Sequence, residues 1–131
     1  VLRYVLQYSG LGDLIGNAVS SANLPIVLVA FIVAALVRIC VGSATVAMTM
    51  AAGIIAAMPG ISELPPLYLA CVVAAVAGGS TVCSHFNDSG FWLVRSLVGV
   101  DEKTNLKTWT IMETLVGFSG FVVAFIISLF V

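Results

Sequence analysis

The chain has 131 residues, of which 61% are hydrophobic and only 8% are charged, and its mean hydropathy is +1.19. Soluble domains contain about 25% charged residues, so this composition excludes an ordinary soluble protein and indicates an integral membrane protein or a part of one. The formal net charge is −1 and the five basic residues form no cluster, which excludes a nucleic-acid-binding protein.

The beginning of the chain predicts that more sequence precedes it. The first residue is Val1, and the opening VLRYVLQ has the composition of the end of an apolar segment. We therefore expect the C-terminal part of a longer protein. Residues 10–21 follow, with apolar side chains three and four positions apart and polar side chains on the other side. This pattern predicts a short amphipathic connecting helix.

A long apolar segment at 24–58 is interrupted by GSAT at residues 42–45. One straight helix of this length would measure about 50 Å, against about 30 Å for the hydrocarbon core of a bilayer. Residues 46–58 alone would reach about 20 Å and cannot cross. Two arrangements remain: a re-entrant helical hairpin with GSAT at its tip, or a spanning helix that breaks at GSAT. The hairpin is favoured, and either arrangement places GSAT within the membrane.

Residues 67–98 form a second interrupted segment. Its first part, Leu67–Ala77, is apolar, but Gly78–Val94 gathers glycine, serine, threonine, histidine, asparagine and aspartate. We expect the helix to break at Gly78-Gly79 and to resume near Phe91, which gives a discontinuous helix. Unsatisfied polar groups are costly in lipid, so such a break indicates a cavity enclosed by protein, where a solute or an ion binds.

The C-terminal region contains a polar loop and then an uninterrupted apolar segment. Residues 99–106 hold the densest charge of the chain and predict an aqueous loop. Residues 109–131 predict a simple transmembrane helix, with Trp109 as an anchor at the membrane interface. Glu113 is expected to face water there and is given no role. Close helix contacts are expected at two glycines of this helix, Gly117 and Gly120.

The polar break carries two titratable groups and several neutral hydrogen-bonding groups. His85 and Asp88 can take up and release a proton in a low-dielectric site, while Asn87 and Ser89 suit the hydroxyl groups of a solute. A structural alternative is that His85 and Asp88 pair with each other, or that Asp88 caps the helix that follows. The pair lacks further ligands for a metal ion, so we expect no metal site.

Arg38 is the only positive charge inside the long apolar segment, where a charge costs at least about 2.5–3.5 kcal/mol. It should therefore have a partner. As a functional group it would clamp the carboxylate of an anionic solute; the alternative is that it snorkels to the interface. In the tip, Gly42, Ser43 and Thr45 offer backbone N–H groups and hydroxyls at a helix start, which suit an anion. Small residues there also suit close helix packing.

Three stretches, in this order, carry a resemblance to a known family: RICVGSATVAMTMAAGI at 38–54, SHFNDSGFWLV at 84–94 and LKTWTIMETLVGFSG at 106–120. They resemble the C-terminal portion of the gluconate:proton symporter family of bacterial permeases, and YSGLGDLIG at 8–16 also fits. The resemblance implies an all-α integral membrane fold. The chain would be the second-repeat half of an ion-transporter-superfamily-like carrier, holding its re-entrant hairpin, discontinuous helix and terminal transmembrane helix.

The same resemblance implies proton-coupled uptake of gluconate or a related hydroxylated carboxylate across the bacterial inner membrane, by a multi-pass carrier that is not an enzyme. No cofactor is implied, and sodium is the chief rival of the proton as coupling ion. The hypothesis for the proton is His85 or Asp88. The residues implied for the substrate are Arg38, Gly42, Ser43, Thr45, Ser84, Asn87 and Ser89.

Other functions remain open at this point. A permease for D-serine or another organic acid, sodium-coupled or not, is one alternative, and a non-transporting packing subunit is another. The implied partners are the sugar-acid substrate, the lipid bilayer and a first repeat upstream in the same protein. The oligomeric state, monomer or homo-oligomer, is left open.

Overall fold

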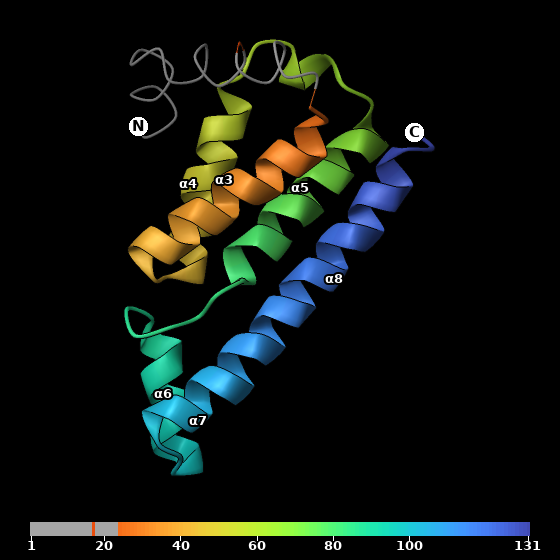
Figure 1. Cartoon of the computed structure of the whole chain (residues 1–131). Coiled ribbons are helices and arrows are strands. Elements are labelled where there is room, and N and C mark those ends of the chain that lie inside the picture. The colour runs from red at the N-terminus through yellow and green to blue at the C-terminus, as the bar shows by residue number, and fades with distance from the viewer. Residues whose placement is uncertain (1–16, 18–23) are drawn as a thin grey trace.

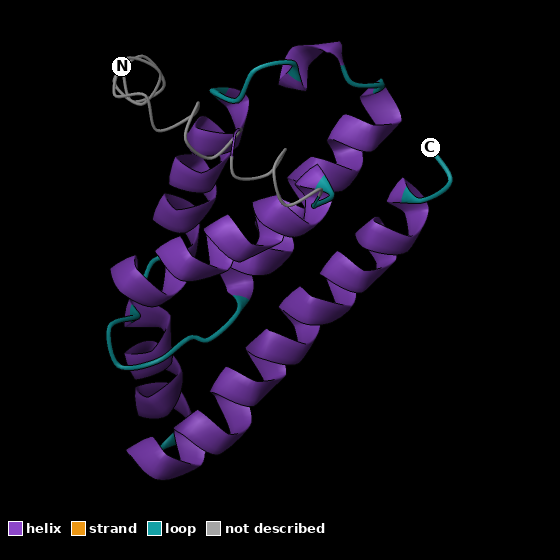
Figure 2. Ribbon diagram, turned by 45° about the horizontal axis from the view of Figure 1, so that its top comes forward, coloured by secondary structure: helices purple, strands orange, loops and turns teal. Residues whose placement is uncertain are grey.

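The computed structural model describes Asn17 and residues 24–131, and every regular element within 24–131 is a helix. The predicted all-α fold class is thus confirmed. The connecting helix expected at 10–21 lies, apart from Asn17, outside the described residues. Helix α5 lies between α3 and α8, and α4 packs against α3 and α5 (Figures 1 and 2). The bounds of these four helices are Ile26–Val41 for α3, Ala44–Ala56 for α4, Pro66–Thr81 for α5 and Ile111–Ser128 for α8.

The apolar segment at 24–58 folds into two helices that pack side by side, α3 and α4 (Figure 1). Helix α3 ends at Gly42, whose φ of 76° lies in the left-handed region that glycine adopts most readily. Helix α4 begins after Ser43, whose hydroxyl accepts a hydrogen bond of 3.4 Å from the Val46 N–H. The chain therefore reverses at Gly42-Ser43, and we call residues 42–45 the tip.

Helix α5 continues through Gly78 and Gly79 to Thr81, so the expectation that the helix breaks at these glycines is wrong. The reason is contact with neighbouring helices. A Cβ atom on Gly78 would lie 2.6 Å from the Gly117 carbonyl oxygen of α8, and one on Gly79 would lie 2.4 Å from the Phe31 carbonyl oxygen of α3. The hydroxyl of Thr81 donates within α5, to the Ala77 carbonyl at 2.7 Å. Both glycines therefore allow close packing without interrupting the helix.

The non-helical part of the second segment is Val82–Asp88, which we call the polar loop. It is shorter than the predicted break, because helix α6 already starts at Ser89 and extends to Val98. Asp88 caps this helix: its Oδ1 accepts a hydrogen bond of 2.9 Å from the Gly90 N–H. The polar loop runs from the lower end of α5 to the start of α6 and passes below the tip in Figure 1.

The C-terminal helix is longer at its start than the sequence predicts. Helix α7 (Glu102–Asn105), a π-helical turn η2 (Leu106–Thr110) and α8 follow one another without a loop. Asp101 caps α7, with its Oδ2 accepting a hydrogen bond of 3.4 Å from the Thr104 N–H. Residues 102–106 of the predicted aqueous loop are therefore helical. The continuous helix Glu102–Ser128 has 27 residues, and within the described residues it alone is long and apolar enough to cross a membrane.

Small residues and aromatic rings make up the core between α3, α5 and α8. Phe31 of α3 stacks on Phe121 of α8 with ring centroids 4.2 Å apart, while Ala34 and Ala75 are fully buried. The outer face of α8 is apolar and exposed, for example at Leu115 (63% exposed). Such a surface suits contact with lipid or with the rest of a membrane protein.

Replacing Gly117 by alanine is expected to destabilise the fold by about 1–3 kcal/mol, because the added methyl group would overpack a helix contact. Its Cβ would lie 2.4 Å from the Gly78 carbonyl oxygen. The matched control is Gly120→Ala on the same helix, where no described atom lies within 4 Å. That variant is expected to gain up to about 1 kcal/mol from helix propensity. Thermal unfolding of the full-length protein in detergent measures both, and equal midpoints would contradict the packing account.

Candidate functional site

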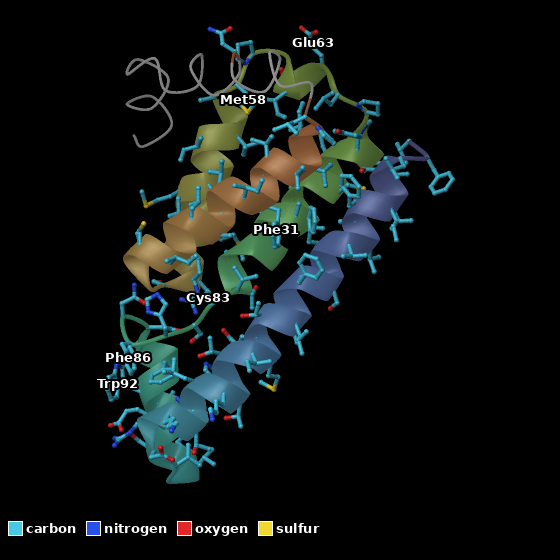
Figure 3. The ribbon with its side chains drawn as sticks, in the orientation of Figure 1. Phe31, Met58, Glu63, Cys83, Phe86 and Trp92 are labelled. Atoms are coloured by element: carbon cyan, nitrogen blue, oxygen red, sulfur yellow. The ribbon has the colours of Figure 1, made fainter. Side chains whose placement is uncertain are left out.

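The polar loop is fixed to η2 and α8 by hydrogen bonds to its backbone and to one of its side chains. The Cys83 N–H donates to Thr114 Oγ1 at 3.1 Å, and the Thr110 hydroxyl donates to the Ser84 carbonyl. The indole N–H of Trp109 donates to Ser84 Oγ at 3.0 Å. Cys83 has a φ of 57°, unusual for a residue other than glycine. Figure 3 shows Cys83 beside the end of α5. These bonds hold a strained loop in one conformation.

The opposite side of the polar loop contacts the tip. The Asn87 side-chain amide donates to the Ile39 carbonyl at 2.8 Å, one of the carbonyls at the C-terminal end of α3 that no helical N–H satisfies. Gly42 faces the backbone of the same residue, since a Cβ on Gly42 would lie 2.3 Å from the Asn87 carbonyl oxygen. The loop and the tip therefore form one contiguous structure.

Three charged side chains meet between the tip, the polar loop and α8, and we call Arg38, Asp88 and Glu113 the charge cluster. Arg38 Nη2 lies 2.5 Å from Asp88 Oδ2 and 3.6 Å from Glu113 Oε2. Arg38 Nη1 donates to the Gly42 carbonyl at 2.5 Å, and Arg38 is only 2% exposed. A buried arginine thus connects α3 and the tip to a carboxylate on each of two other elements.

Asp88 is the most heavily bonded member of the charge cluster. Its Oδ2 accepts hydrogen bonds from Arg38 Nη2 and from Ser84 Oγ, each at 2.5 Å, and its Oδ1 accepts the capping bond from the Gly90 N–H. The predicted capping role is confirmed. Asp88 pairs with Arg38 rather than with His85, so that proposed pairing is wrong; the His85 backbone carbonyl accepts from the Asp88 N–H at 2.8 Å.

Arg38 has the partner that its burial requires, as the sequence predicts, and that partner is 50 residues away along the chain. The snorkelling alternative is wrong, because the guanidinium is enclosed by protein and ion-paired. Its Nε atom is buried and has no hydrogen-bond partner within the described part of the chain. A buried donor without a partner is uncommon, so Arg38 has capacity for one more acceptor.

The other predicted site residues differ in how deeply they are buried between the tip and the polar loop. Ser84 is buried beside Asp88, whereas His85 is half-buried. Ser43 is half-buried and its hydroxyl is used in capping α4. Thr45 and Ser89 are exposed. The structure therefore brings together Arg38, Gly42, Ser84, Asn87 and Asp88.

Sequence reasoning missed the contribution of α8. Trp109 and Thr110, in the turn η2 directly before α8, contact Ser84, and Thr114 contacts Cys83. Glu113, expected to face water and given no role, joins the charge cluster. The indole N–H of Trp109, which is predicted as an interface anchor, donates to Ser84 Oγ, a contact that the sequence did not indicate. A signal was available, because positions 109, 110, 113 and 114 share one face of a helix by their spacing.

An apolar cavity of about 550 Å³ lies elsewhere, between α4, the short 3₁₀ helix η1 (Ile61–Glu63) and α5. Met48, Ile55 and Val76 are among the residues that line it, and no member of the charge cluster does. Its wall offers almost no polar group for a charged or hydroxylated solute. The charge cluster is therefore the stronger candidate for a functional site.

Several transporters are similar to this chain over nearly all of its length. The low-affinity gluconate transporter of Escherichia coli (strain K12) is 44% identical over 128 residues, which is 96% of this chain and 28% of that protein. The gluconate permease of Pseudomonas aeruginosa is 40% identical over 127 residues, 97% of this chain and 28% of that protein. The Gnt-II system L-idonate transporter of Escherichia coli is 38% identical over 118 residues, 90% of this chain and 26% of that protein.

No solved structure matches the chain. The chain spans 28% of the length of the first two relatives, so it corresponds to about a quarter of each. The model of the GntP family permease matches residues 1–130. The resemblance indicated by the GSAT and HFNDSGFW motifs is confirmed, and this membrane protein chain belongs to the GntP permease family.

Proposed function

We propose that the full-length protein containing this chain imports gluconate or a related sugar acid, coupled to proton uptake, as a multi-pass protein of the bacterial inner membrane. It acts as a secondary transporter and not as an enzyme. The names of the relatives support the substrate class. The observation that carries the proposal is Arg38, a buried guanidinium whose Nε has no hydrogen-bond partner among the described residues, placed where tip, polar loop and α8 meet.

Arg38 is proposed to bind the carboxylate of the substrate. Arginine binds carboxylates through a planar fork of N–H donors, and a charge-assisted hydrogen bond in a protein interior is strong. Gly42, Ser43 and Thr45 add the N–H groups and hydroxyls of the tip. The carboxylate of Asp88 already occupies part of the fork, so the substrate and Asp88 compete for the same cation.

The rest of the site is proposed to recognise hydroxyl groups and to carry the proton. Ser84, Asn87 and Ser89 offer neutral hydrogen bonds along the polar loop, and His85 and Asp88 are the proton candidates that the sequence predicts. The hairpin of α3 and α4 is proposed as re-entrant, and α5 with α6 as the discontinuous helix of a second repeat. The first repeat, upstream in the full-length protein, would complete the site.

The experiment is uptake of radiolabelled gluconate into proteoliposomes that contain the full-length protein. A pH gradient with the acidic side outside the vesicles is expected to drive gluconate accumulation inside them. A protonophore, which dissipates the gradient, is expected to abolish this accumulation. Accumulation that follows a sodium gradient and ignores the pH gradient would establish sodium as the coupling ion instead. Normal accumulation by both His85→Ala and Asp88→Asn variants would exclude these two residues as proton carriers. If the protein takes up L-idonate but not gluconate, the proposed substrate is wrong but the proposed substrate class, sugar acids, is retained.

A further inference from the structure

Glu113 is the least satisfied member of the charge cluster. Its carboxylate lies 3.6 Å from Arg38 Nη2, beyond hydrogen-bonding distance, and its side chain is 20% exposed. No side chain or backbone group within the described residues donates a hydrogen bond to it. Asp88, by contrast, accepts three hydrogen bonds. The two carboxylates thus share one guanidinium but differ in how firmly they are held.

Because of this difference, adding a proton costs less free energy at one of the two carboxylates than at the other. A proton on Asp88 Oδ2 would displace the hydrogen bond from Arg38 or the one from Ser84, both inside the protein, and a lost buried hydrogen bond costs about 1–3 kcal/mol. A proton on Glu113 would break no hydrogen bond that the structure shows. Two ionised carboxylates close to one cation also repel each other, which favours a proton on one of them.

The surroundings of Glu113 contain no other charge that would take over this role. Arg38 comes from α3 and Asp88 from the end of the polar loop, while α5 and the rest of α8 carry no charged residue. The turn η2 before α8 carries Lys107, which is exposed and forms no ion pair with Glu113. His85 and Cys83 are the other titratable groups of the polar loop. Among the described residues, Arg38 is thus the cation whose charge balance a proton on Glu113 would change.

We propose that Glu113, rather than His85 or Asp88, binds the coupled proton, and that its protonation removes one of the two negative charges beside Arg38, so that the guanidinium can attract the carboxylate of the transported anion. This rests on the proposed function. With both acids ionised the cluster has a net charge of −1 and repels an anion. The proton adds to a carboxylate oxygen of Glu113 from water on one side of the membrane, which makes the cluster neutral. A monovalent sugar acid then restores the charge of −1, and the proton leaves to water on the other side.

The site consequently has the same net charge when it is empty and when it holds one proton with one anion. A carrier of this kind has the same charge in the two conformational changes of a transport cycle, so that one complete cycle moves no net charge across the membrane. An anion without its proton would make the cluster doubly negative, which is unfavourable in a low-dielectric interior. Coupling therefore follows from electrostatics at Arg38 and requires no direct contact between proton and substrate.

The decisive variant is Glu113→Gln, which imitates the protonated state. It is expected to exchange labelled internal for unlabelled external gluconate at a rate within about threefold of the unmodified protein and independently of pH. Accumulation driven by a pH gradient is expected to fall at least 20-fold. Glu63→Gln is the matched control, since Glu63 is exposed in η1, far from the polar loop (Figure 3). It should leave both activities and their pH dependence unchanged.

Proton-driven accumulation by Glu113→Gln with an unchanged pH profile would overturn the proposal. If this variant does not reach the membrane, the Glu113→Asp variant tests the proposal in its place. Aspartate keeps a titratable group but changes its distance from Arg38. The Glu113→Asp variant is expected to accumulate gluconate with a shifted pH optimum, and an unshifted optimum contradicts the proposal. Failure of the proposed function is distinct, because the unmodified protein would then neither exchange nor accumulate gluconate.

Discussion

Replacing Arg38 by glutamine is expected to abolish gluconate accumulation and to destabilise the full-length protein by about 3–5 kcal/mol. The large effect arises from the two carboxylates that this substitution leaves without a cation. Asp88 and Glu113 would remain beside each other without their cation, and Asp88 would lose a hydrogen bond of 2.5 Å. Unfolding in detergent measures the free energy, and uptake into proteoliposomes measures the activity.

Two further variants separate stability from function at Arg38. In the double variant Arg38→Gln with Asp88→Asn, the unpaired charge of Asp88 is removed while the amide oxygen still caps α6. Its destabilisation is expected to be smaller than the sum of the two single effects by about 0.5–3 kcal/mol, while uptake remains absent. Arg95→Gln is the control: Arg95 pairs with Glu102 at 2.7 Å, but both side chains are more than one-third exposed. It should cost less than about 1 kcal/mol.

Two results would contradict the predicted role of Arg38 in substrate binding. If Arg38→Gln accumulates gluconate with a KM within threefold of the unmodified protein, the guanidinium does not bind the substrate. If the double variant regains uptake as well as stability, Arg38 serves only to neutralise Asp88. Either result would move the substrate site away from the charge cluster.

Replacing Gly42 by alanine is expected to be the most damaging change of a single methyl group, at about 2–5 kcal/mol and with loss of uptake. Two effects add. The left-handed conformation costs a residue with a Cβ about 1–2 kcal/mol, and overpacking costs about 1–3 kcal/mol more. At a φ of 76° the new Cβ would lie 2.3 Å from the Asn87 carbonyl oxygen. A backbone atom cannot yield as a flexible side chain does, so tip and polar loop must separate.

Gly60 provides a close control for this substitution. Its φ of 77° is nearly the same, but no described atom lies within 4 Å of the position of its Cβ. Gly60→Ala is therefore expected to cost only the conformational part, about 1–2 kcal/mol, and to keep uptake. The difference between the two variants isolates the contact between tip and polar loop. Equal effects in unfolding and in uptake would show that this contact is unimportant.

The sequence predicts those features of the site that depend on local composition. The reversal near GSAT follows from the small residues and from a segment too long for one span, and the burial cost of Arg38 requires a partner. The cap at Asp88 follows from an aspartate directly before an apolar helix. Each of these arguments uses neighbours within a few residues, and the structure agrees with each.

The features that the sequence does not predict depend on contacts between distant segments. Gly78 and Gly79 look like helix breakers in sequence, but α5 continues through them because α8 and α3 approach closely there. The choice of Arg38 rather than His85 as the partner of Asp88 depends on how α3 meets the polar loop. Glu113 reaches the cluster only because α8 crosses beside α5. The spacing of 109, 110, 113 and 114 indicates only that one face of the helix is polar, and no local pattern says which distant segment that face contacts.

The hydrogen bonds of the polar loop also impose an order on assembly during synthesis. Residues 82–84 leave the ribosome before their partners Trp109, Thr110 and Thr114 exist. Until η2 and α8 are made, the loop has only its own turn and its contacts to α3, the tip and α6. The candidate site is therefore complete only after η2 and α8 have been synthesised, and a nascent chain stopped before residue 109 should leave the polar loop accessible to protease.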